Sequence, residues 1–193
     1  MILEGKETIF ETGVFRDFIG TVQTLSGVPY PAYQKKEGVM SSEEKAVLRS
    51  YRIVTDHVRA SNKLMVDGVR PSNDARGYVL RRLMRRARLH IKRLCVDPEN
   101  PDFQQGNYKS IWYIIGEQSK DVQKLNNTMT REIEQLWMDE IDQFEKTLDR
   151  GQKHLEKIMA QGVNEVISGT DAFLLSDTYG FPLELTQEMA AEQ

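Results

Sequence analysis

Apolar residues recur at helical spacing over most of the chain, which predicts a helical protein. The first such stretch covers residues 15–25, and Gly27 follows it as a stop signal. Two prolines and a glycine then predict a loop over residues 28–40. Ser41 and Glu44 form a capping-box pair that predicts the start of a second helix, with its end at Gly68. The positions expected to be buried in that helix are Val47, Tyr51, Val54, Val58 and Met65.

A third helix is predicted after a short connection. Pro71 disfavours helical geometry at Arg70, and Ser72 or Asn73 can cap the helix that follows. The apolar positions expected to be buried in it are Leu80, Leu83, Met84, Ala87, Ile91 and Leu94.

The second half of the chain is predicted to hold one long helix and several short ones. After a loop at 96–103, a short helix is expected at 108–117 and a long one at 120–159, before Gly162 interrupts the pattern. Short helices at 172–176 and 187–192 flank a turn at 179–182. The apolar positions of the long helix are Val122, Leu125, Met129, Ile133, Leu136, Phe144, Leu148, Leu155 and Ile158.

Strand signals are absent apart from one extended pair, Val166 and Ile167, so the predicted fold class is all-α. We expect a long helix packed on the basic third helix, with short C-terminal helices. A single helical domain over residues 1–193 is expected, with residues 1–40 leading into a main body at 41–193.

Composition is typical of a globular protein without a membrane segment. Hydrophobic residues make up 39% and charged residues 28% of the chain, and no apolar run approaches the roughly 20 residues of a membrane helix. The N-terminus has no secretory signal pattern. The single cysteine, Cys95, excludes an internal disulfide and fits a reducing compartment, so a cytoplasmic location is expected.

The net charge of −3 conceals a strong asymmetry between the two halves of the chain. Residues 1–93 contain 18 Lys and Arg against 10 Asp and Glu, whereas residues 94–193 contain 8 against 19. Such an asymmetry indicates an anionic partner for the first half. Attraction between the two halves is the alternative.

The positive charge is concentrated on the predicted third helix, where no acid occurs between Asp74 and Asp97. Nucleic-acid phosphates neutralise such a surface and release counterions, which gives affinity without base specificity. The equally weighted alternative is that several of these side chains pair with acids of the long helix. The basic residues are Arg76, Arg81, Arg82, Arg85, Arg86, Arg88, Lys92 and Arg93.

The sequence offers no constellation for catalysis. The histidines and the cysteine lack zinc-ligand spacing, and no glycine-rich phosphate loop occurs. We expect His57, His90 and His154 to be solvated or core-edge residues, and Cys95 to be a small core residue. The acids at 132–149 are expected to form a solvated face. No cofactor or metal is expected in this chain.

Several segments resemble the alanyl-tRNA synthetase family, in the order that the family has them. The most specific is SNDARGYVLRRLMRRA, preceded by YRIVTDHVRASNKLMVDGVRPSN. FEKTLDRGQKHLEKI and SGTDAFLLSDTYGFPLELT follow, and FETGVFRDFI is similar to the segment just past the third class II motif. The resemblance implies a helical tRNA-recognition domain that follows the class II catalytic core.

The resemblance also implies which functions lie outside the chain. In the family, the sheet that binds ATP and alanine precedes this region, and the metal-bearing editing domain follows it. The full-length family uses ATP, Mg and Zn. We therefore expect a piece of a larger ligase, excised rather than naturally reduced and inactive alone. Its expected partners are the acceptor stem of alanine tRNA and the ligase's catalytic and editing domains.

The family recognises a G·U wobble pair from the minor-groove side of the acceptor stem, and two positions carry over. The Asn of the PSN motif is Asn73, and the Asp of DTYGFP is Asp177. A-form RNA has a wide, shallow minor groove, in which guanine presents an exocyclic amine that a carboxylate can accept from. Without the resemblance, Asn73 is read as a helix cap and Asp177 as a turn residue.

The framework around the basic helix matches the family at Tyr78 as well as at its arginines. The residues expected to contact the tRNA backbone are Arg76, Arg81, Arg82, Arg85, Arg86, Arg88 and Lys92. Arg81, Arg82, Arg85 and Arg86 are expected to divide between phosphate contacts and internal ion pairs.

This sequence departs from the family at three positions. The family commonly has an acid where Gly13 stands, and Glu-Gly where Asp74 and Ala75 stand. These departures bear on local capping and on the boundary of the N-terminal helix.

The competing hypothesis is a helical scaffold or protein-interaction module without nucleic-acid specificity. The long helix keeps no strict heptad along 122–158, which argues against an extended coiled coil.

Overall fold

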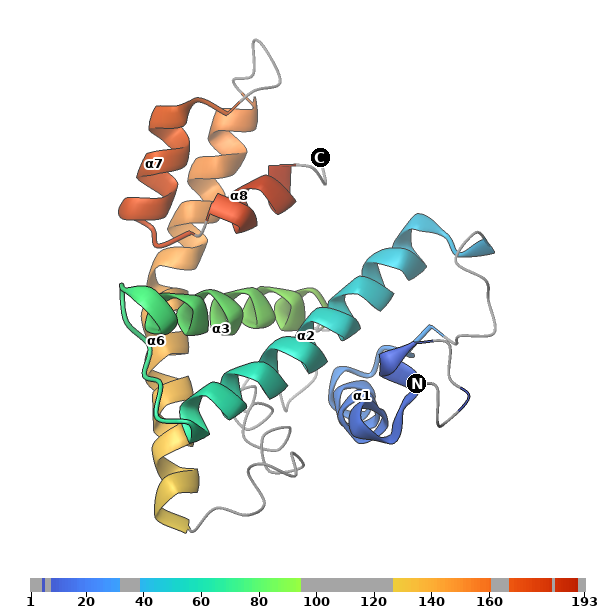
Figure 1. Ribbon diagram of the computed structural model, residues 1–193. Helices are drawn as coiled ribbons and strands as arrows, with labels where there is room; N and C mark the ends of the chain where they lie inside the picture. The colour runs from blue at the N-terminus through green and yellow to red at the C-terminus, as the bar shows by residue number, and fades with distance from the viewer. Residues whose placement is uncertain are drawn as a thin grey trace. The chain divides into compact units, whose positions relative to one another are not determined.

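The computed structural model describes residues 5, 8–31, 39–94, 127–160, 167–181 and 183–190. These residues form six α-helices, one 3-10 helix and no strand, so the predicted all-α class is confirmed (Figure 1). The described part of the chain contains no helix that is long and apolar enough to span a membrane.

The chain divides into two compact units, Met1–Met138 and Asp139–Gln193. The first unit contains η2 (Ile9–Glu11), α1 (Gly13–Ser26), α2 (Ser42–Val66), α3 (Ala75–Leu94) and the start of α6 (Asn127–Ala160). The second contains the rest of α6, α7 (Gly169–Asp177) and α8 (Leu183–Ala190). The single domain expected from the sequence stays a prediction.

Helix α1 confirms the first predicted helix. Its apolar residues Phe15, Phe18, Ile19 and Val22 are buried. The helix ends at Gly27, which has φ 68° and so adopts the left-handed conformation that favours glycine at a helix C-terminus.

Tyr51 of α2 anchors α1 and the loop after it. Its hydroxyl donates to the carbonyl of Val28 and lies 3.3 Å from the Ser26 hydroxyl. The ring of Tyr30 packs edge-on against the Tyr51 ring, with centroids 4.9 Å apart. This polar and aromatic cluster explains why a tyrosine is completely buried here.

Helix α2 begins with the predicted capping box. The Ser41 hydroxyl accepts from the Glu44 amide at 3.1 Å, and the Glu44 carboxylate accepts from the Ser41 amide at 2.9 Å. Of the positions expected to be buried, Tyr51, Val54, Val58 and Met65 are buried, but Val47 is only half-buried and Leu48 is buried instead.

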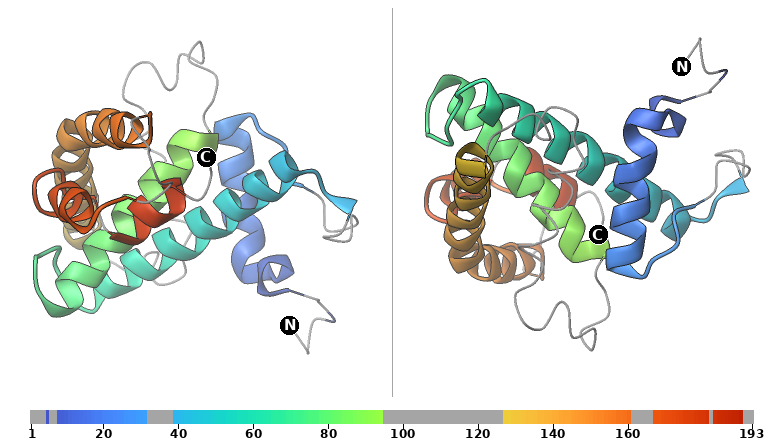
Figure 2. Two further views of the ribbon diagram at one scale, coloured as in Figure 1. Left: turned by 90° about the horizontal axis from the view of Figure 1, so that it is seen from above. Right: turned by 90° about the horizontal axis from the view of Figure 1, so that it is seen from below.

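Helix α3 lies beside α2 (Figure 2). Leu83 is only half-buried, although it was expected in the core. His90 is buried, with its Nδ1 atom 3.0 Å from the Ser50 hydroxyl of α2, so it belongs to the core rather than to the core edge. The other residues expected to be buried are so: Leu80, Met84, Ala87, Ile91 and Leu94.

The start of α6 packs on the end of α2 within the first unit. The indole nitrogen of Trp137 donates to the Asn62 side-chain oxygen at 2.8 Å, and both residues are buried. An ion pair of 2.5 Å joins Arg70 to Glu132 nearby. The sequence reading omitted Trp137 from the apolar stripe.

In the second unit, Phe144, Leu148 and Leu155 of α6 are buried as predicted. Helix α7 is longer than the expected 172–176, because Ser168 caps it by accepting from the Asp171 amide at 3.1 Å. Helix α8 begins earlier than the expected residue 187 and packs against α7. Outside the described residues lie the predictions for 96–103, 108–117, Cys95, Gly162, Val166 and the first turns of the long helix.

Candidate nucleic-acid interface

Asn73 lies on the short loop between α2 and α3 and is exposed. The loop bends through Ser72, whose hydroxyl contacts the Asp74 amide at 3.3 Å and the Asp74 carbonyl at 3.1 Å. Neither Ser72 nor Asn73 accepts from an amide in the first turn of α3, which begins at Ala75. The predicted cap is therefore wrong, because the serine folds back on the loop rather than onto the helix.

The Asn73 loop packs directly on the first turn of α3 at Gly77. A Cβ atom added at Gly77 would lie 2.1 Å from the Ser72 hydroxyl and 2.6 Å from the Arg70 carbonyl oxygen. Both distances are shorter than any real carbon contact allows. The close approach of the loop therefore requires a glycine at this position.

Ala75, the first residue of α3, has φ 45°. Within the described part of the chain it is the one non-glycine residue with positive φ. A left-handed backbone brings Cβ close to the following carbonyl, and only glycine avoids this cost. The departure from the family pattern, alanine where glycine is usual, thus falls on a strained position.

Arg81 contacts the candidate base-reading residue. Its guanidinium donates to the Asn73 side-chain oxygen Oδ1 across about two turns of helix and loop. Sequence reasoning placed Arg81 among residues that contact phosphate or pair with acids, and the spacing gave no signal of a bond to an amide.

The cations of α3 are not equally accessible. Arg76 and Lys92 are exposed, whereas Arg85 and Arg88 are buried, with only 8% and 7% of their surface accessible. Arg81, Arg82, Arg86 and Arg93 are half-buried. Of the residues expected to contact the tRNA backbone, all but Arg76 take part in further interactions within the described part of the protein. The positive surface is therefore narrower than eight charges in the sequence suggest.

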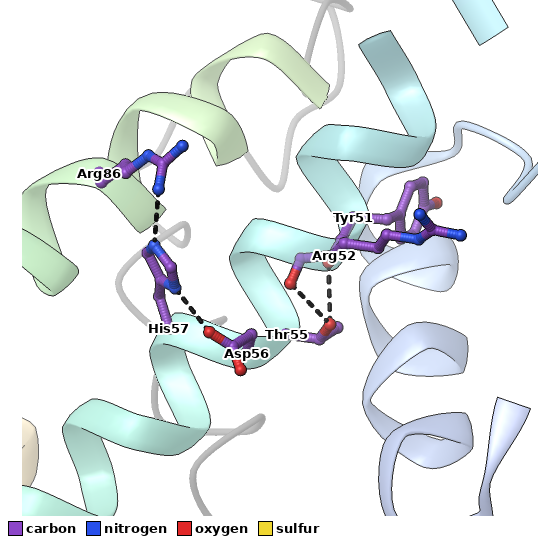
Figure 3. A network of polar contacts seen from close by, with 6 residues as sticks. All are labelled: Tyr51, Arg52, Thr55, Asp56, His57 and Arg86. Atoms are coloured by element: carbon purple, nitrogen blue, oxygen red, sulfur yellow. Dashed lines mark hydrogen bonds and ion pairs between the residues drawn. The ribbon is translucent and has the colours of Figure 1, made fainter. Parts of the chain in front are cut away.

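A chain of three polar side chains links α2 to α3 at Arg86 (Figure 3). The guanidinium of Arg86 lies 3.3 Å from His57 Nε2, and a guanidinium can only donate, so Nε2 accepts. The other ring nitrogen, Nδ1, then carries the proton and donates to the Asp56 carboxylate at 2.9 Å. This hydrogen bond holds the pKa of Asp56 below its ordinary value, although burial of the carboxyl opposes the shift.

Thr55 and Arg52 of α2, drawn beside these residues in Figure 3, make contacts of their own. The Thr55 hydroxyl donates to the carbonyl of Tyr51 at 2.9 Å and lies 3.3 Å from the carbonyl of Arg52. The Arg52 guanidinium lies over the ring of Phe10, 5.4 Å from its centroid, in a cation–π contact. His57, through its contacts with Asp56 and Arg86, links α2 to α3. The sequence does not reveal this role, because Arg86 is 29 residues away and no motif joins His57 to either partner.

Asp177 is the last residue of α7 and is exposed. A carboxylate at this end faces the negative pole of the helix dipole, which disfavours it. Beyond Asp177 the chain turns at Gly180, which has φ 62°, and the Phe181 amide donates to the Leu175 carbonyl at 2.9 Å. The turn therefore closes back over the last residues of α7.

The turn after Asp177 is anchored on α6 by its aromatic residues. The fully buried ring of Phe181 packs against Phe144, with centroids 6.1 Å apart, and the Tyr179 ring lies 5.5 Å from that of His154. A Cβ added at Gly151 of α6 would lie 2.7 Å from Phe181 Cε2, so the ring sits where a side chain would otherwise be. His154 is half-buried and contributes to this packing.

Asn73 and Asp177 lie in different units, one on an anchored loop and one before an anchored turn. That they meet at one groove stays a prediction. Among the residues that the structure describes, no group of His, Cys, Asp or Glu is arranged to hold a metal ion.

Comparison with known proteins gives a match over the whole chain. The family model for tRNA synthetases class II (A) matches residues 1–193. The alanine–tRNA ligase of Stenotrophomonas maltophilia is 43% identical over 192 residues, which cover 100% of this chain and 19% of that protein. That of Bifidobacterium longum is 39% identical over 197 residues, covering 100% of this chain and 20% of the relative.

A eukaryotic relative gives the same result. The alanine–tRNA ligase of Candida albicans is 33% identical over 196 residues, covering 99% of this chain and 19% of the relative. The chain spans about a fifth of the length of the curated relatives that it matches. The resemblance seen in the sequence is thereby confirmed at the level of the family. With a family model matched from end to end, this chain belongs to the class II (A) tRNA synthetases.

Proposed function

We propose that this chain binds the acceptor stem of alanine tRNA and reads its G·U wobble pair for an alanine–tRNA ligase. The observation that carries the proposal is that both candidate readers, Asn73 and Asp177, are exposed beside anchored backbone. The proposal is supported by similarity over the whole of this chain to a segment that makes up about a fifth of each alanine–tRNA ligase compared. Catalytic and editing domains that use ATP, Mg and Zn would act on the same tRNA, in the cytoplasm.

The chemistry of the two side chains suits the minor groove of a wobble pair. The guanine amine of such a pair has no base partner, so it is free to donate a hydrogen bond. A carboxylate such as that of Asp177 can accept this hydrogen bond. A carboxylate near RNA is repelled by phosphates, so its position is favourable only where a base amine meets it. Its placement against the helix dipole of α7 is a second cost that an RNA-reading role accounts for.

Phosphate contacts supply affinity rather than specificity in this proposal. We place them first on Arg76 and Lys92, since these side chains are exposed on α3. Arg82 and Arg86 are half-buried and come second. The buried Arg85 and Arg88 are the least accessible of the predicted contacts.

The test is a titration of the chain with acceptor-stem duplexes that differ only at the wobble position. We expect the G·U duplex to bind more tightly than the G·C and A·U duplexes. Asp177→Ala should lower this preference by about tenfold or more, because it removes a charged hydrogen bond, while binding of the A·U duplex changes little.

Glu156→Ala is the matched control, because it removes an exposed carboxylate of the same unit from α6. It should keep the preference for G·U. Equal affinity of the unaltered chain for all three duplexes, or an Asp177→Ala variant with full preference, would contradict the proposal.

A protein-interaction module is the second candidate. It is favoured by Phe173 of α7, which is 67% exposed, and by Leu183, which is 49% exposed in the same unit. Under this alternative the chain would bind no acceptor-stem duplex at moderate salt.

A further inference from the structure

We infer that Arg81 is a positioning residue, which fixes the Asn73 side chain so that its amide nitrogen faces the RNA. The inference rests on the proposed function of Asn73. It assigns Arg81 a role different from the phosphate contact or acid pairing that the sequence suggests.

The orientation of the Asn73 amide follows from the chemistry of its partner. A guanidinium has five N–H donors and no acceptor, so the atom that faces Arg81 is the carbonyl oxygen Oδ1. The amide nitrogen Nδ2 therefore points away from Arg81. Asn73 makes no other polar contact within the described part of the chain, so Nδ2 stays available as a donor.

The loop that carries Asn73 packs closely on the helix that carries Arg81. The loop rests on Gly77, where the Ser72 side chain and the Arg70 carbonyl occupy the space of a missing side chain. Arg81 comes from the next turn of the same helix, so one helix both supports the loop and supplies the guanidinium. An exposed asparagine otherwise samples several rotamers and both amide orientations, and their loss on binding would weaken recognition.

A donor at this position has a specific complement in RNA. The minor-groove acceptors of a base pair are purine N3 and pyrimidine O2. Asn73 would therefore donate to one of these atoms, while the Asp177 carboxylate accepts from the guanine amine. The two readers thus carry opposite hydrogen-bond polarity, and Arg81 sets the polarity of the first.

The test compares substitutions that separate charge from hydrogen bonding, using the chain and the G·U and A·U duplexes. Asn73→Ala should lower the preference for G·U by about threefold to tenfold. Arg81→Met should lower it by the same factor within about twofold, and the double variant should lose no more than either single variant. Arg81→Gln, a neutral donor, should restore part of the preference.

Arg76→Met is the control for charge, because Arg76 is exposed on the same helix and does not contact Asn73. It should weaken both duplexes alike. If Arg81→Met behaves as Arg76→Met does, Arg81 contacts phosphate, and the inference is overturned while the proposed function stands.

A measurement without RNA tests the positioning separately. In the free chain, the NMR signals of the Asn73 side-chain amide should shift in Arg81→Met and return toward their original position in Arg81→Gln. Unchanged signals would overturn the inference. If the signals shift as expected but Asn73→Ala keeps full preference for G·U, the positioning is supported and the proposed role of Asn73 fails.

Discussion

Ala75 stands in a left-handed conformation that costs an alanine about 1–2 kcal/mol. Replacing it with glycine removes this cost but adds about 0.4–1 kcal/mol of unfolded-chain entropy. Ala75→Gly should therefore raise the free energy of unfolding by about 0.5 kcal/mol, measured by urea denaturation. The control is Ala60→Gly, inside α2 with ordinary φ, which should lower it by about 1 kcal/mol. A loss of stability in Ala75→Gly would show that the residue is not strained.

Gly77 gives the opposite result for the opposite substitution. Gly77→Ala should lower the free energy of unfolding by about 1–2 kcal/mol, because the new methyl group overlaps the Arg70 carbonyl. The matched control is Gly20→Ala on α1, where a Cβ meets nothing within 4 Å and the helix gains about 1 kcal/mol. Thermal or urea unfolding should thus move in opposite directions for the two glycines.

The carboxyl of Asp56 makes stability depend on pH in the acid range. Its pKa is lowered from 3.8 mainly by the hydrogen bond from His57, so the charged form is favoured in the folded protein. The resulting stability is present above pH 3.8 and is lost as the pH falls through the lower folded value. Asp56→Asn should therefore be less stable than the unaltered chain at pH 6, and the difference should vanish at the acid end. A difference that grows on acidification would contradict the assignment.

At the level of single residues, the sequence indicates which residues belong to the candidate site better than it predicts how buried they are and which side chains they contact. Asn73 and Asp177 are found through motifs, and both are exposed as a reader must be. The sequence does not predict that Arg85 and Arg88 are buried, because helical periodicity cannot separate a flanking cation from a core one. The link from His57 to Arg86 depends on how α2 and α3 pack, and a single sequence does not encode that register visibly.

Helix α2 owes its start to the reciprocal bonds of Ser41 and Glu44. Ser41→Ala should lower the free energy of unfolding by about 1 kcal/mol, because the Glu44 amide loses its acceptor. Glu44→Gln is the control, since glutamine also completes a capping box, and it should cost clearly less. A larger loss in Glu44→Gln than in Ser41→Ala would show that the charge of Glu44 near the helix N-terminus, rather than the capping box, stabilises this end.

The sequence predicts helix boundaries well where it contains a recognised capping motif, and less well elsewhere. The capping box at Ser41 correctly predicts the start of α2, and Gly27 correctly predicts the end of α1. The expected start of α7 is three residues late, although the pair Ser168 and Asp171 forms a cap that the sequence contains. At α3 neither Ser72 nor Asn73 acts as the cap that its residue type suggests. The Ser72 hydroxyl contacts Asp74 in the loop, and the Asn73 side chain accepts from Arg81 of α3.

At the scale of the whole molecule, the affinity of the proposed RNA binding should fall steeply as the salt concentration rises. Arg76→Met and Lys92→Met should each reduce the slope of log affinity against log salt concentration by about 0.7–0.9, since each removes one phosphate contact. Arg16→Met, which removes an exposed cation from α1, should leave the slope unchanged. An affinity that does not depend on salt concentration would exclude the proposed contacts between RNA phosphates and the basic residues of α3.

Trp137 has a further consequence, for optical measurements. The chain has two tryptophans, and this one is buried with its indole bonded to Asn62. In a Trp112→Phe background its emission would report selectively on the docking of α6 onto α2, without any attached dye. Stopped-flow fluorescence could then time that docking as the chain refolds, and Asn62→Ala would supply the reference in which the indole has lost its partner.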